Sequence, residues 1–217
     1  MYELPLQKVW RLKMEEERRK TGFAKILREM SIRKQEPKRK VFISFCHRDD
    51  DKVKLFLYRW TEREKIFIPK ALGVSDEDDF INSDNPEYVI AQIRKRYIQD
   101  STVTIVLLGS CTHGRRFVDW EIKASLRQGT DNLPNGLLGI LLPNLSSVHL
   151  PERFVDNWNK EHKDCYARYK FSPTNGTELR TWIEDAFQSR KNRFKYIKND
   201  KEIMKYNAKC KICNITH

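Results

Sequence analysis

The chain has 217 residues and a mass of 26.0 kDa, which suits one ordinary domain with appendages and leaves little room for a second. Hydrophobic residues make up 39% and charged residues 33%, and eleven Phe, eight Tyr and five Trp supply apolar bulk for a core, which argues against wholesale disorder. The formal charge of +12 first suggests a nucleic-acid binder, but residues 41–185 carry 20 basic against 22 acidic side chains, so the charge lies on the two ends.

Residues 1–39 are predicted to form a basic helical arm, and residues 1–40 hold 13 basic against 6 acidic side chains. The segment 8–36 has apolar residues at helical spacing, with a soft interruption at Gly22. Four of them follow the i, i+3, i+4, i+7 pattern: Phe23, Ile26, Leu27 and Met30. Such a helix packs on its own domain or on a sister chain, or else binds a partner or a lipid surface.

The body is predicted to alternate strands and helices from residue 40 onward. Its first half has a strand at 40–45 (KVFISF), a helix at 52–64, a short strand at 65–68, a polar stretch at 73–85 and a helix at 86–97. Pro86 suits the first turn of that last helix, because proline has no amide hydrogen to lose there.

The second half of the body repeats this alternation. It has a strand at 101–109 (STVTIVLLG), a helix at 117–128 closed by Gly129, a strand at 136–142, loop and short helix at 143–165, a strand at 167–171 and a helix at 175–193. A basic tail, residues 194–217, follows, and residues 186–217 hold 9 basic against 2 acidic side chains.

Strands and helices that alternate at this spacing indicate βαβ crossovers. We therefore expect an α/β domain at 40–193 with a flavodoxin-like, doubly wound parallel sheet of about five strands. Ligands of such sheets bind beyond the carboxyl ends of the strands. The segments to inspect are accordingly those after Phe45, Ile68 and Gly109.

Glu121 is the candidate catalytic residue. On a helix that begins near Phe117, the positions of Val118 and Ile122 face inward, and Glu121 lies to one side of this apolar stripe. We expect its carboxyl group to be half desolvated at the ligand edge. The alternative is an ordinary solvated glutamate on a helix surface.

Three blocks of sequence resemble the Thoeris-type TIR-like domains, the prokaryotic branch of the Toll/interleukin-1 receptor fold used in antiphage defence. The blocks are KVFISF, STVTIVLLGS followed by CTHGRRFVDWEIKAS, and GLLGILL, which together cover roughly residues 40–142. The family pattern R-W-V-x-x-E-I-x-x-S falls on Arg116, Phe117, Val118, Glu121, Ile122 and Ser125, with Phe117 in place of the usual Trp.

The resemblance implies that NAD is the substrate, that its nicotinamide-ribose bond is cleaved and that Glu121 is the essential residue. The implied product is a cyclic or conjugated ADP-ribose signal that activates a separate effector, with a phage-derived activator and a homo-oligomer as further implied partners. No metal and no cofactor beyond NAD as substrate are expected.

The resemblance also places nucleotide-contacting residues after the first strand. Ser44, Phe45, His47 and Arg48 lie there, where family members line the pocket. Phe45 is expected to stack on a base or the nicotinamide, and Arg48 to contact pyrophosphate. The alternatives are core packing for Phe45 and a polar turn for His47 and Arg48.

The remaining candidate residues are Asp79, Phe80, Asp84 and Asn85 in the segment after the second strand, Ser110 after the central strand, and Phe117. The segment departs from the family, because it contains no Trp and its acidity would repel a pyrophosphate. Ser110 lacks a G-x-S-x-G elbow, so we expect a hydrogen bond to the loop or to a ribose hydroxyl, and no nucleophilic role.

Five cysteines, an odd and scattered set, and the absence of a leader-like start predict a cytoplasmic protein without structural disulfides. Cys210 and Cys213 form a lone CxxC, for which a metal site within one chain is not expected; the alternative is an ion shared by two chains. The longest apolar runs are far shorter than a membrane span of ~20 residues. Two other functions stay open: a non-catalytic TIR-like assembly module, and a nucleic-acid sensor that uses the basic ends.

Overall fold

A computed structural model describes residues 16–22, 37–71, 85–128, 133–161 and 163–216. The chain divides into two compact units, residues 1–38 and 39–217. Within the first unit, residues 16–22 form a helix with an ion pair between Glu16 and Lys20. The rest of the helix predicted at 8–36, and the polar stretch at 73–84, lie outside the described residues.

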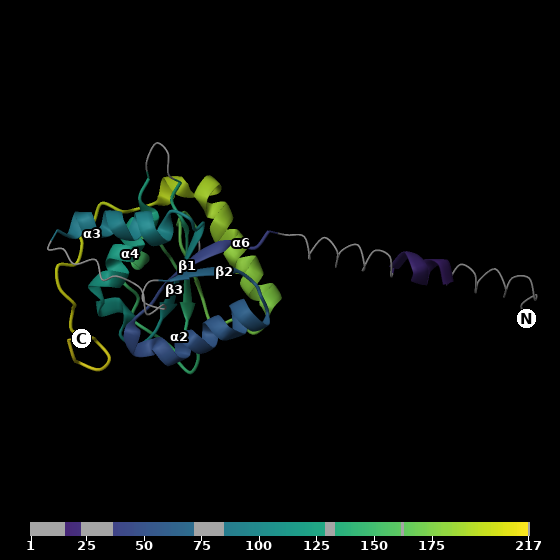
Figure 1. Ribbon diagram of the computed structural model, residues 1–217, viewed down its shortest axis with the longest axis horizontal. Coiled ribbons are helices and arrows are strands. Elements are labelled where there is room, and N and C mark those ends of the chain that lie inside the picture. Colours follow the sequence, from purple (N-terminus) through teal and green to yellow (C-terminus); the bar gives the residue numbers. More distant parts are fainter. Residues whose placement is uncertain (1–15, 23–36, 72–84, 129–132, 162, 217) are drawn as a thin grey trace, which may run out of the picture. The chain divides into compact units, whose positions relative to one another are not determined.

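A parallel sheet forms the centre of the second unit (Figure 1). The strands among the described residues are β1 (Lys40–Ser44), β2 (Ile68–Ala71), β3 (Val103–Leu108), β4 (Gly136–Leu141) and β5 (Arg168–Lys170). They are all parallel in the order β2-β1-β3-β4-β5, with Ser44 opposite Val106. The predicted flavodoxin-like, doubly wound sheet is confirmed, because the order reverses direction after β2.

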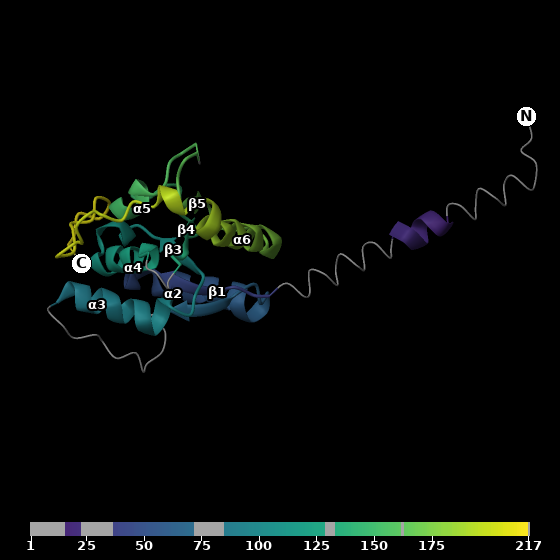
Figure 2. The same ribbon diagram turned by 90° about the horizontal axis from the view of Figure 1, so that it is seen from above.

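Helices cover both faces of the sheet, as Figures 1 and 2 show. The helices and helical turns among the described residues of this unit are η1 (His47–Asp49), α2 (Asp50–Leu57), η2 (Tyr58–Arg63), α3 (Pro86–Ile93), η3 (Arg94–Ile98), η4 (Thr112–Gly114), α4 (Arg116–Leu126), α5 (Glu152–Asp156), α6 (Gly176–Asn192) and η5 (Phe194–Tyr196). Helices α2 and α6 pack on one face through side chains such as Phe56 and Ile183. Helices α3, α4 and α5 pack on the other face.

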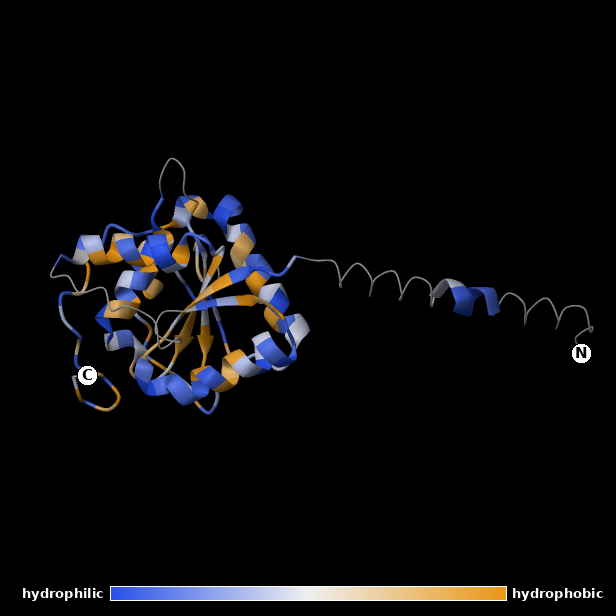
Figure 3. Cartoon of the chain, in the orientation of Figure 1, coloured by the Kyte–Doolittle hydropathy of each residue, from blue (hydrophilic) through white to orange (hydrophobic). Residues whose placement is uncertain are grey.

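The central strands β3 and β4 are buried along their whole length, as their continuous apolar runs predict. Figure 3 shows these strands as hydrophobic arrows, and the helices that surround them carry hydrophilic residues as well as apolar ones. Asn85 accepts hydrogen bonds from the amides of Glu87 and Tyr88 and so caps α3, which begins at Pro86.

The second strand lies three residues later than predicted. The sequence favoured 65–68, whereas β2 spans Ile68–Ala71. Lys65 has a φ of 52°, in the left-handed region, and Ile66 N donates to Trp60 O, so the chain is still turning out of η2 there. The extended segment therefore begins only after this turn is complete.

The tail, residues 194–217, runs beside α4 in its described part. Met204 O accepts a hydrogen bond from Trp120 Nε1 at 2.9 Å, and Ala208 N donates to Gly114 O at 2.9 Å. Asn207 Oδ1 accepts from the amide of Arg116, the first residue of α4. The tail thus belongs to the same compact unit as the sheet. No helix in the described part of the chain is long and apolar enough to cross a membrane.

Candidate functional site

Glu121 and Ser44 meet beneath the carboxyl end of β1. Ser44, the last residue of β1, points its hydroxyl at α4 and donates to Glu121 Oε2 at 2.6 Å. Both side chains are buried, and Glu121 is only 6% exposed. Burial raises the pKa of the Glu121 carboxyl to about 8, although the hydrogen bond from Ser44 opposes the shift. The group is therefore mostly protonated at pH 7.

This burial differs from the half-desolvated position that the helical pattern predicted for Glu121. The pattern assumed one buried stripe on α4, but residues from Val118 to Leu126 are buried with the single exception of Lys123. The cause is that α4 lies between the sheet on one side and the tail on the other, with Trp120 bonded to Met204. A helix covered on two sides leaves Glu121 buried.

The loop after β1 holds three of the predicted nucleotide-contacting residues. Phe45 is half-buried, and its ring makes an edge contact with His47 at 5.4 Å between ring centroids. His47 Nδ1 lies 3.5 Å from Asp50 Oδ1, and both His47 and Arg48 are exposed. The loop therefore offers an aromatic ring, an imidazole and a guanidinium together at the ligand edge of the sheet.

Asp49 is a site feature that the sequence analysis did not single out. Its carboxyl group lies against Gly109, the residue after β3, where a Cβ atom would collide with Asp49 Oδ2. Burial raises the pKa of this carboxyl group, and Oδ2 has no hydrogen-bond partner among the described residues. The position of Asp49 just after β1 was the signal in the sequence that could have identified it. Three consecutive aspartates lie there, however, and the sequence does not show which of them turns inward.

The other predicted site residues are spread over different surroundings. Ser110 follows β3, and its carbonyl group accepts a hydrogen bond from Cys210 Sγ at 3.5 Å. Phe117 lies on α4 in edge contact with Trp120 and beneath the guanidinium of Arg116. Asn85 is a helix cap, as described above. Asp79, Phe80 and Asp84 lie outside the described residues.

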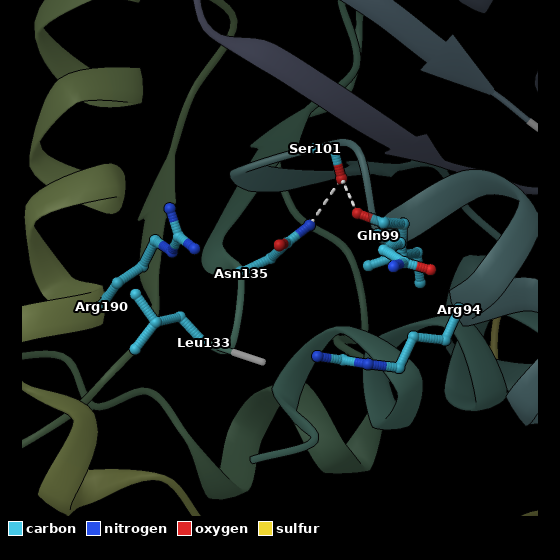
Figure 4. A pocket seen from close by; sticks show the side chains of 7 residues that line it. Arg94, Gln99, Ser101, Leu133, Asn135 and Arg190 are labelled. Atoms are coloured by element: carbon cyan, nitrogen blue, oxygen red, sulfur yellow. Dashed lines mark hydrogen bonds between the residues drawn. The ribbon is translucent and has the colours of Figure 1, made fainter. Parts of the chain in front are cut away.

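A cavity of about 210 Å³ lies at the opposite edge of the sheet, near the amino ends of β3 and β4 (Figure 4). It is lined by Arg94, Ile98, Gln99, Ser101, Leu133, Asn135 and Arg190. Ser101 and Asn135 are bonded to each other there, with the amide donating to the hydroxyl at 2.7 Å. We place the candidate site at Glu121 instead, because doubly wound sheets bind ligands at the carboxyl edge.

Comparison with known proteins follows this geometry. Residues 42–147, which span the core of β1 through β4 and include Glu121, match the family described as Thoeris protein ThsB, TIR-like domain. No curated protein matches the chain significantly. A ribose 5-phosphate isomerase from Thermotoga maritima shares 17% identity over 73% of this chain and 97% of its own, with a TM-score of 0.27, a likeness too weak to carry an argument.

Proposed function

We propose that this protein consumes NAD in antiphage defence, because residues 42–147 match the family described as Thoeris protein ThsB, TIR-like domain. The reaction is cleavage of the nicotinamide-ribose bond. The product is a cyclic signal derived from ADP-ribose. A separate effector detects it. The observation that carries the proposal is the buried Glu121 carboxyl group bonded to Ser44 below the ligand edge of the sheet.

The chemistry suits a carboxyl group in this position. Nicotinamide leaves NAD as a neutral base, so positive charge develops on the ribose ring in the transition state. A preorganised carboxylate nearby stabilises that charge and accepts hydrogen bonds from ribose hydroxyls. Glu121 performs this role, and the positive nicotinamide ring of bound NAD favours its ionised form, against the effect of burial.

The neighbouring residues divide the remaining tasks. Ser44 is a positioning residue, since its hydroxyl fixes the Glu121 carboxyl group. Phe45 offers its ring for stacking on a base, and Arg48 a charge-assisted contact to the pyrophosphate. His47 and the Ser110 hydroxyl offer hydrogen bonds to the ribose.

A second candidate function is a non-catalytic assembly module of the same fold. The observation that favours it is the near-complete burial of Glu121, because a carboxyl group that stays covered reaches no substrate. The two functions differ in one measurable respect, which is whether NAD is consumed at all.

The test is mass spectrometry of the small molecules that the full chain forms from NAD, with and without extract from phage-infected cells. We expect nicotinamide and one ADP-ribose-derived species from the wild type and from Glu62→Gln, a control on the exposed side of η2. Glu121→Gln should form neither. Intact NAD in every reaction would favour the assembly module, and product formation by Glu121→Gln would refute the assigned role.

A further inference from the structure

Three cysteine sulfurs from distant parts of the sequence converge at one point beside the carboxyl edge of the sheet. Cys111 lies in the loop after β3, and Cys210 and Cys213 lie in the tail. Their sulfur atoms all lie within 4.8 Å of one another. Cys111 and Cys210 are buried, and Cys46, which follows β1, is buried in the same cluster. All these residues are thiols and none is in a disulfide.

The separation of the sulfurs fits a metal better than it fits a disulfide. Cys111 Sγ lies 3.6 Å from Cys213 Sγ. The S–S bond of a disulfide is about 2.05 Å long. Sulfurs that surround a tetrahedral zinc ion at about 2.3 Å lie about 3.8 Å from one another. The observed arrangement is thus close to the spacing around one bound ion.

The backbone around Cys210 is folded as a tight turn that points amides at sulfur. Asn214 N donates to Cys210 O at 2.8 Å, and Cys210 N donates to Ile215 O at 2.9 Å. Asn214 has a φ of 63°, which the turn requires, and Lys209 pairs with Thr216 across it. Ile212 N donates to Cys210 Sγ at 3.4 Å. This is a preformed C-x2-C turn, the spacing that structural zinc sites use.

The turn surrounds the sulfur of Cys210 with a backbone donor and neighbouring cations. Ile212 N donates to Cys210 Sγ. Lys209 and Lys211 flank Cys210 in sequence and reduce the charge of a thiolate cluster. Metal-bound thiolates need such outer partners, because each thiolate adds a negative charge.

We propose that Cys111, Cys210 and Cys213 bind one zinc ion within a single chain. Three thiolates suit zinc, which prefers sulfur and nitrogen ligands in a tetrahedral site. The ion would fasten the tail to the loop that follows β3. This loop carries Ser110, so the metal would also order the ligand edge of the sheet.

The inference differs from the sequence expectation, which gave a lone CxxC no metal within one chain. One ligand was missing, because Cys111 lies 99 residues before Cys210 in the sequence. Only the fold brings it beside the tail. The proposal stands on these contacts alone and is independent of any NAD chemistry.

The test is the zinc content of the full chain, purified under reducing conditions without chelator and measured by elemental analysis. We expect about one zinc per chain for the wild type and for Cys165→Ser, a matched control because Cys165 is buried outside the cluster. The double variant Cys210→Ser/Cys213→Ser should lose the metal. Wild-type protein without zinc, or an unchanged content in the double variant, would overturn the proposal.

A second measurement uses folded protein only and so does not depend on how the double variant folds. Chelator-treated wild type is reloaded with Co²⁺, whose visible spectrum reports tetrahedral coordination and whose thiolate charge-transfer band scales with the number of sulfurs. Cys111→Ser should reduce that band by about a third, and Cys46→Ser should leave it unchanged. A spectrum without tetrahedral bands, or a Cys111–Cys213 disulfide found by mass spectrometry in the reduced preparation, would contradict the zinc site.

Discussion

At the scale of single residues, the environment of Glu121 decides its protonation. Burial favours the neutral acid, while the hydrogen bond from Ser44 favours the carboxylate, and burial wins because the pKa rises to about 8. A titratable group with a strongly raised pKa at the ligand edge of a fold is typical of a functional site. The same burial lowers the free energy of unfolding at neutral pH, because the Glu121 carboxyl group ionises more readily in the unfolded chain, where water surrounds it.

The pH dependence of stability tests this account of Glu121. The folded-state pKa is raised above the usual value of 4.5, so the native state binds more protons than the unfolded chain between these two values. Stability is therefore lost as the pH rises from about 4.5 to about 8. Glu121→Gln removes the ionisation and should be more stable than the wild type by about 4 kcal/mol at pH 8, and nearly equal to it at pH 4.5.

Urea denaturation of both proteins at the two pH values measures this difference. Glu62→Gln, on the exposed side of η2, serves as a control that should show no such pH-dependent gain. A difference between Glu121→Gln and the wild type that does not change with pH would show that the carboxyl group is not held neutral.

The structure brings together two candidate residues of the sequence analysis. Glu121 came from the helical pattern and the family resemblance, and Ser44 from the resemblance, and the two are hydrogen-bonded. The inward turn of Asp49 was not predicted, since it depends on the close approach of Gly109. Cys111 was not predicted as a metal ligand, because the spacing of residues along a chain does not show which of them the fold brings into contact.

At the scale of elements, α4 is fixed by a buried ion pair. Arg153 of α5, fully buried, donates from Nε to Asp119 Oδ1 at 2.8 Å. The same guanidinium donates to carbonyl groups of Lys201 and Glu202 in the tail, and Asp119 Oδ2 accepts from Met204 N. One pair of charges thus joins α4, α5 and the tail.

Breaking this pair should cost far more than breaking a surface pair. Arg153→Met leaves the Asp119 carboxylate buried without its cation, and we expect a loss of about 3 to 5 kcal/mol in the free energy of unfolding. Lys201→Met removes exposed pairs to Glu152 and Asp156 and should cost less than about 1 kcal/mol. Urea denaturation measures the free energy of unfolding of both variants. Equal losses would show that the buried ion pair does not hold α4, α5 and the tail together.

The strands and helices were predictable to different degrees. Continuous apolar runs predicted β3 and β4, because these strands are buried along their whole length. Helical periodicity predicted α2 and α6, because each of these helices buries apolar side chains against the sheet. The tail bears no such pattern. It is held by hydrogen bonds to Trp120, Gly114 and Asp119, which hydropathy does not reveal.

At the scale of the whole molecule, the positive charge of the tail belongs to the folded domain. The basic tail is part of the compact unit 39–217, and Lys201 in it pairs with two acidic residues of α5. The charge of residues 194–216 therefore lies on the surface of the domain. A nucleic-acid function based on a detached basic tail gains no support from this arrangement.

Hydrogen exchange measured by mass spectrometry tests the packing of the tail. The amides of Met204, Ala208 and Cys210 all donate hydrogen bonds in the structure. Peptides that contain them should exchange slowly, over the same times as peptides from surface helices of the domain. Complete exchange of the tail at the earliest time point would show that it is detached in solution.

The most direct measurement of the central proposal is the rate of nicotinamide release from NAD as a function of pH. The wild type should show a kcat/KM that rises with pH up to about 8, because the ionised form of Glu121 is the active one. At pH 8, Glu121→Gln should be slower than the wild type by about 100-fold or more, and Glu62→Gln should be unchanged. Equal turnover by the wild type and Glu121→Gln would contradict the account.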